Sequence, residues 1–94
     1  MLTKMAVVPT KATTAQTIPA AEAVTGVWGL AGGATAVALT TYTVQASAPA
    51  SADEVQFTGK PGAPSKTLTF DAALTDGGLV LVEYVPVGGA GAAA

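Results

Sequence analysis

The chain has 94 residues and a formal net charge of −2, and it contains no His and no Cys, whereas Ala and Thr together fill more than a third of its positions. This composition supplies almost no groups for general acid–base catalysis, thiolate chemistry or the ligation of soft metals at neutral pH. The 4 cationic residues are all Lys and are dispersed along the chain, so no basic patch can follow a phosphate backbone. We therefore expect no enzyme, no cofactor, no metal site and no nucleic-acid partner.

The length fits a single domain with one small hydrophobic core. Ala buries little area, so the core must be built mainly from Val, Leu and the few aromatic residues. A chain that is rich in Val and Thr and poor in helix formers favours strands. The absence of Cys excludes disulfide cross-links, so additional stability must come from association with other chains.

Residues 1–22 carry two prolines and no lasting helical or strand periodicity. We interpret them as an extended N-terminal arm that is either disordered or laid on a neighbouring molecule. Its β-branched apolar side chains are Val7, Val8 and Ile18, which makes these residues candidate interface anchors. The apolar stretch at 5–8 is shorter than the roughly 7 to 15 residues of a signal peptide, so export by that route is not expected.

A β domain is expected over residues 23–87, and a flexible tail over 88–94. Apolar and β-branched patterns predict strands at 24–30, 34–45, 54–58, 66–71 and 79–87. Over 34–39 the frequent Ala residues leave a helix as an alternative. The linker at 46–52, the loop at 59–65 and the turn at Asp76-Gly77 separate the strands.

Residues 23–52 carry no formal charge. This raises the alternative of a small membrane protein that uses 23–45 as its span. Frequent Gly, Ser and Thr residues interrupt the apolar character of this segment, so we expect no membrane partner. Trp28 lies in the same segment, between Gly26 and Gly29. It is either a core residue or an interface anchor, since Trp is enriched among the residues that dominate binding energies.

The closing pattern of the chain is Thr67-Leu68-Thr69-Phe70, then Ala72-Ala73-Leu74, Asp76-Gly77-Gly78 and Val80-Leu81-Val82-Glu83-Tyr84. This pattern resembles the terminal hairpin of small β-rich virion proteins of tailed bacteriophages, including head decoration (cement) proteins. The resemblance covers residues 67–84 and is a hydrophobic pattern rather than a catalytic motif. It implies a protein on the outer surface of a capsid, arranged as a trimer or another symmetric cluster, that ties adjacent capsomers together.

The expected fold is mainly β: a small antiparallel sandwich or barrel of about five strands, with the N-terminal arm and C-terminal tail outside it. The expected function is that of a structural virion protein that decorates and stabilises a phage capsid. Its partners would be the major capsid protein and further copies of itself, with a trimer favoured. It would be made in the host cytoplasm and reside on the capsid surface, with the arm clamping a neighbour and the 59–65 loop facing outward.

One further alternative comes from a different class of protein. The chain could be a ligand- or glycan-binding β-module of a tail fibre or a cell-surface assembly. That alternative predicts an exposed aromatic platform on a monomer, whereas the decoration hypothesis predicts an apolar contact surface and association.

Overall fold

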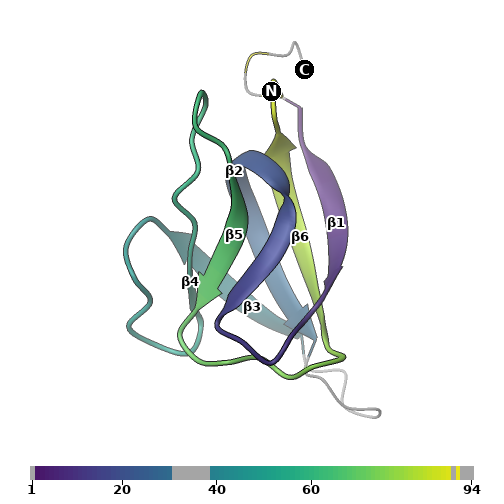
Figure 1. The fold of residues 1–94 in the computed structure, drawn as a ribbon, viewed down its shortest axis with the longest axis vertical. Coiled ribbons are helices and arrows are strands. Elements are labelled where there is room, and N and C mark those ends of the chain that lie inside the picture. Colours follow the sequence, from purple (N-terminus) through teal and green to yellow (C-terminus); the bar gives the residue numbers. More distant parts are fainter. Residues whose placement is uncertain (1, 31–38, 90, 92–94) are drawn as a thin grey trace.

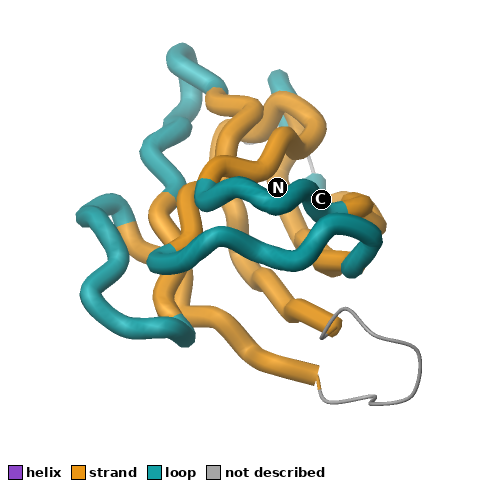
Figure 2. Tube along the Cα trace, turned by 60° about the horizontal axis from the view of Figure 1, so that its bottom comes forward, coloured by secondary structure: helices purple, strands orange, loops and turns teal. Residues whose placement is uncertain are grey.

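The computed structural model describes residues 2–30, 39–89 and 91, and this part of the chain contains strands, turns and loops but no helix (Figures 1 and 2). The prediction of a mainly β fold is confirmed. The strands are β1 Lys4–Pro9, β2 Ala15–Leu30, β3 Leu39–Gln45, β4 Glu54–Gln56, β5 Ser65–Phe70 and β6 Leu79–Pro86. Their β-branched and aromatic residues suit a pleated, half-buried surface.

All of these strands belong to one sheet, in the order β1-β6-β2-β3-β4-β5. An additional pairing between β2 and β5 closes β2, β3, β4 and β5 into a small barrel-like ring. β6 and β1 extend the sheet from β2 beyond the ring, and β1 lies at the right-hand edge in Figure 1. The pairings between the described strands are antiparallel except that of β3 with β4, which is parallel. Of the two expected architectures, the chain adopts the barrel-like one.

β2 is the longest of these strands, with 16 residues, and it belongs to both parts of the sheet. Its residues 15–21 pair with β5, and its residues 21–30 pair with β6. Ala21 lies at the junction, opposite Ser65 on β5 and Pro86 on β6, and the register shifts on both sides of it. Such irregularities bend and twist a strand. β2 can therefore serve the closed ring and the extension at once.

The hydrophobic core collects the inward side chains of both parts of the sheet. Its most deeply buried large apolar side chains are Val27, Val55, Leu68, Val82 and Val85. At its margin the ring of Tyr42 meets the ring of Phe70 edge to face, with centroids 5.0 Å apart and an interplanar angle of 81°. This geometry stabilises a pair by about 0.5–1.5 kcal/mol beyond simple burial.

The segment expected to form a separate N-terminal arm is part of the sheet, which corrects that expectation. β1 pairs with β6 along its whole length. The side chains of Val8 and Ile18 are only 7% and 4% exposed and belong to the core. The strand pattern of β1 was hidden because its solvent-facing residues Met5 and Val7 are apolar, so β1 lacks the usual apolar–polar alternation.

The terminal hairpin expected over residues 67–84 is also absent. β5 and β6 are not partners, because both pair with β2, which lies between them. The apolar pattern of the two strands reflects burial of each against β2 and the core. It does not reflect pairing of one with the other.

The turn predicted at Asp76-Gly77 is present. Gly77 has a φ of +86°, a conformation that Gly adopts without steric cost, and the Gly78 N–H donates to the Thr75 carbonyl over 3.3 Å. The Thr10 hydroxyl donates to the same carbonyl. The turn is thereby held against the end of β1.

The connection between β1 and β2 is built around Gln16, which is 2% exposed. Its side-chain nitrogen donates to the carbonyls of Lys11 and Thr13 over 2.9 and 2.7 Å, and its side-chain oxygen accepts from the Lys11 N–H over 2.9 Å. A buried amide is costly unless its polar groups are paired. Gln16 therefore fixes the path of this connection.

The remaining expectations concern the later strands and the tail. The strands predicted at 54–58, 66–71 and 79–87 correspond to β4, β5 and β6, with shifts of one or two residues at their ends. The prediction over 34–45 is described only from Leu39 onward, and the helix alternative falls almost wholly outside the described residues. Of the expected tail, Gly88, Gly89 and Gly91 are described, and the Leu2 N–H donates to the Gly89 carbonyl over 3.0 Å.

Candidate functional site

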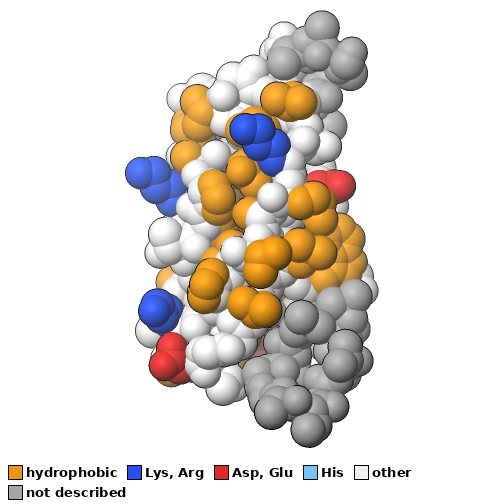
Figure 3. Space-filling view, turned by 90° about the vertical axis from the view of Figure 1, so that its right-hand side faces the viewer, with side chains coloured by type: hydrophobic (Ala, Val, Ile, Leu, Met, Phe, Trp, Pro, Cys, Tyr) orange, Lys and Arg blue, Asp and Glu red, His pale blue; other side chains and the backbone are white. Residues whose placement is uncertain are grey.

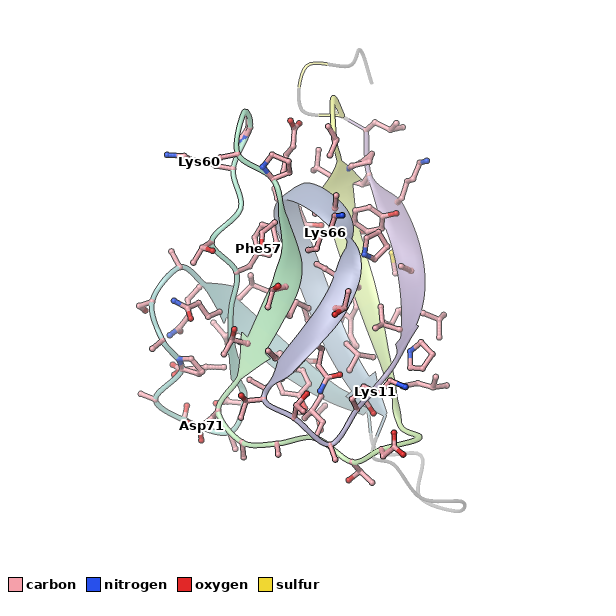
Figure 4. The ribbon with its side chains drawn as sticks, in the orientation of Figure 1. Lys11, Phe57, Lys60, Lys66 and Asp71 are labelled. Carbon is pink, nitrogen blue, oxygen red and sulfur yellow. The ribbon has the colours of Figure 1, made fainter. Side chains whose placement is uncertain are left out.

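Charged groups do not gather into a reactive site in the part of the chain that the structure describes. No group of three or more Asp or Glu residues there could hold a metal ion. Lys11 and Lys60 lie toward opposite ends of the long axis in Figure 4, and Lys60 points away from the body of the protein at the tip of its loop. The apolar surface is therefore the better candidate for a functional site.

Alternation along β1 and β6 leaves apolar side chains on the solvent side of the sheet. On β1, Val8 faces the core, whereas Met5 and Val7 are 52% and 63% exposed. On β6, Val80 and Val82 are buried, whereas Leu79 is 38% exposed and Leu81 is partly exposed. Both strands are thus apolar on their two faces.

The register brings these outward residues side by side across three strands. Val7 of β1 lies opposite Leu81 of β6, and Leu81 lies opposite Trp28 of β2. Two residues further along β1, Pro9 lies opposite Leu79 of β6. We call this surface the outer face; it comprises Met5, Val7, Pro9, Trp28, Leu79 and Leu81. Figure 3 shows apolar side chains gathered on the side of the molecule that β1 borders.

Trp28 lies along the outer face and does not project from it. A Cβ atom on Gly26 would be 2.8 Å from Cζ3 and 2.9 Å from Cζ2 of the Trp28 ring, so the indole covers the backbone of the glycine two residues earlier. The side chain is half-buried as a result. The absence of a side chain at Gly26 is what allows Trp28 to adopt this position.

One acidic side chain borders the outer face. Glu83 lies opposite Met5 on one side and Gly26 on the other. Thr25, the extra residue at a register shift in β2, donates from its hydroxyl to the Glu83 carboxylate over 2.7 Å. The hydrogen bond from Thr25 thus holds the Glu83 carboxylate at the border of the outer face.

The structure separates the residues predicted as interface anchors into two pairs. Val7 and Trp28 lie on the outer face, and Leu81 joins them. Val8 and Ile18 are buried in the core and present no surface to a partner. The prediction grouped Val7 with Val8 because both are β-branched apolar residues of the expected arm, but adjacent residues of a strand point to opposite faces.

Sequence reasoning missed four residues of the outer face: Met5, Pro9, Leu79 and Leu81. The signal that could have found Leu79 and Leu81 is the run Leu79–Val82, which is apolar at successive positions. A run that is apolar on both faces predicts a strand that is central or sandwiched, and β6 is central, between β1 and β2, although its Leu79 is 38% exposed. The same pattern results when one face packs on the core and the other is left for a partner.

Comparison of the chain with protein-family models, curated proteins and solved structures finds no match. In the described part of the chain no helix is long and apolar enough to cross a membrane. The described portions of residues 23–45 form strands and not the helix that the membrane alternative requires.

Proposed function

We propose that this protein is a structural virion protein that stabilises a phage capsid by binding across neighbouring capsomers through its outer face. The observation that carries the proposal is the row Val7–Leu81–Trp28, which is contiguous across three paired strands, exposed at Val7 and partly exposed at Leu81 and Trp28. Contiguous apolar patches larger than a few hundred Å² mark sites at which proteins bind partners. The choice of a capsid as that partner rests on the resemblance of the sequence pattern of residues 67–84 to decoration proteins. It rests on the apolar pattern alone, because β5 and β6 do not pair as a hairpin.

The energetics suit a protein that acts in many copies. Burial of apolar surface stabilises by roughly 25 cal/mol per Å², and Met5 and Val7 each retain more than half of their surface to bury. Association also costs translational and rotational freedom, so one small face gives a modest affinity. Repetition on a lattice multiplies the strength of modest contacts.

The placement of the aromatic rings favours a protein partner over a glycan. A glycan platform would need an exposed ring. Phe57, Phe70 and Tyr84 are buried, and Trp28 and Tyr42 are half-buried. The outer face offers aliphatic contact area instead, which suits the surface of another protein.

The test is cosedimentation of the purified protein with capsid shells that lack it. A Val7→Lys variant places a charge in the middle of the outer face and introduces a side chain that edge strands commonly carry. A Thr67→Lys variant is the matched control, because Thr67 is an exposed strand residue on the ring, away from the outer face. We expect Val7→Lys to abolish binding at a fixed ratio to the shells and Thr67→Lys to retain it. Equal binding by both variants would contradict the proposal.

A further inference from the structure

We propose that the free edge of β1 pairs with β1 of a second copy of this chain, antiparallel and with a two-fold axis at Ala6. The inference rests on the proposed function only in that the pairing would join two outer faces into one binding surface. The backbone pattern, the charges and the symmetry of β1 favour a second copy of the chain as the partner of this edge.

The backbone pattern identifies which groups of β1 are available. The Thr10 N–H donates to the Gly78 carbonyl over 2.8 Å, in the same register that places Lys4 opposite Tyr84. In an antiparallel pair, alternate residues direct both N–H and C=O to the same neighbour. Even-numbered residues of β1 therefore bond to β6, whereas Met5 and Val7 direct theirs away from it. Within the described residues, β1 has no strand partner other than β6.

The ends of β1 are protected and its middle is not. Monomeric proteins block free strand edges with Lys, Pro, bulges or covering segments. Lys4 begins β1 and Pro9, which has no N–H, ends it. Between them Met5–Val8 carries no charge and no Pro, and its register with β6 is regular. Met5–Val8 is therefore a short segment of β1 that is open to pairing, and Lys4 and Pro9 limit it at its two ends.

The charge of Lys4 selects the orientation. Parallel pairing would set the two Lys4 side chains about 5 Å apart, the spacing of adjacent strands. Antiparallel pairing centred on Ala6 separates them along the strands by about 13 Å, which exceeds the Debye length of about 8 Å at physiological salt. A centre at Met5 halves that separation, and a centre at Val7 sets Met5 against Pro9, which has no donor.

Pairing centred on Ala6 is self-complementary. Met5 of each copy lies opposite Val7 of the other, and both residues have the N–H and C=O groups to form a hydrogen-bonded pair. The side chains of these residues belong to the outer face, so the faces of the two copies become continuous across the new pair of strands. Because the contact is isologous, it closes at two copies and does not propagate into a fibre.

The first measurement is the mass of the purified protein in solution by light scattering over a range of concentrations. We expect a species of twice the 9.1 kDa chain mass. A monomer at every concentration would overturn the pairing, and so would the trimer that the resemblance to decoration proteins implies.

Cross-linking tests the register. The chain contains no Cys, so an Ala6→Cys variant carries a single thiol, and residues at a non-hydrogen-bonded antiparallel position have Cα atoms about 4.5 Å apart, within disulfide range. We expect mild oxidation to give a covalent dimer of Ala6→Cys and little of the control Thr67→Cys. Equal cross-linking of both variants, or a cross-link from position 6 to a capsid protein in place of a second copy, would overturn the inference.

A third variant keeps the test independent of the thiol. Val7→Pro removes an N–H that points away from β6, so no hydrogen bond to β6 is lost, and we expect the dissociation constant of the dimer to rise at least about tenfold. An unchanged dissociation constant would overturn the pairing. Shell cosedimentation separates the two proposals: a monomer that binds shells overturns the pairing alone, and a dimer that ignores them overturns the proposed function alone.

Discussion

Val7 and Trp28 are both register partners of Leu81, one from each side of β6. They are far apart in sequence, and the single residue between them in space belongs to the last strand of the described sheet. The candidate site is therefore a product of strand order, and Leu81 is its central residue.

Substitution of Leu81 by Lys should weaken binding to the partner surface at least about tenfold while leaving the fold intact. Leu81 is partly exposed on the outer face, so the ammonium group of a Lys there can reach water in the free protein but not under a partner. Binding is measured by cosedimentation and folding by thermal unfolding. Val82→Lys should instead prevent folding, because Val82 is fully buried. Binding of Leu81→Lys at the level of the unmodified protein would contradict the site.

Gly26→Ala should destabilise the protein by about 1–3 kcal/mol, the usual cost of forcing extra atoms into occupied space. The new methyl group would overlap the Trp28 ring, so the ring must leave its place. Urea unfolding measures the loss, and tryptophan fluorescence reports the displaced ring. In a Trp28→Ala background the same substitution should cost little, and a double-mutant cycle that shows no coupling would refute the contact.

Gln16→Ala should destabilise by about 1–3 kcal/mol, since the backbone groups of Lys11 and Thr13 lose their bonds to the buried amide. Thr17→Ala is the matched control, because Thr17 is the exposed neighbour on the same strand. Denaturant unfolding of the two variants gives the comparison. A cost for Gln16→Ala no larger than that for Thr17→Ala would show that the β1–β2 connection does not depend on the amide.

Gly77→Ala should destabilise by about 1 kcal/mol because φ there is +86°, a region that disfavours residues with a Cβ atom. Gly77→Asn should restore part of the loss, since Asn tolerates this conformation better than Ala does. Thermal unfolding of the two variants provides the test. Equal stability of Ala and Gly at this position would mean that the turn adopts another conformation in solution.

Tyr42 gives a prediction for alkaline pH. Burial raises the pKa of its phenol above the ordinary value of 10.0. The folded state therefore holds the proton more tightly than the unfolded chain, and this contribution to stability is complete below the unfolded pKa and is lost as the pH rises through the folded pKa. Tyr42→Phe should show a smaller decline in stability at pH values above the ordinary pKa. An equal decline in both proteins, measured by denaturant unfolding, would assign the effect to other groups.

The sequence predicted the fold class and most of the later strands because Val, Thr and aromatic residues dominate them. It did not predict β1 or the first half of β2. Met5 and Val7 are apolar at solvent-facing positions, where a strand with one exposed face usually has polar residues. Pro19 interrupts the pattern of β2. These positions depart from simple patterning because β1 contributes to the outer face and β2 bends. Neither property can be inferred from local periodicity in the sequence.

Two of the six residues of the outer face were also predictable. Val7 and Trp28 stand out in the sequence by residue type, but their proximity depends on β6 lying between β1 and β2. Nothing local in residues 1–30 indicates that a strand near the far end of the chain separates them. Val8 was wrongly predicted as an anchor for a different reason: residues 1–22 show no strand periodicity, so the alternation that turns Val8 toward the core could not be applied to them.

The position of β6 also determines when the fold can form. β1 is synthesised before the other described strands, yet its only strand partner among them is β6, the last of them in chain order. Contacts between distant segments slow folding because the chain must close long loops before it gains their stabilisation. Until Leu79–Pro86 emerges, β1 and the second half of β2 have unpaired edges. Completion of the sheet is thus coupled to synthesis of β6.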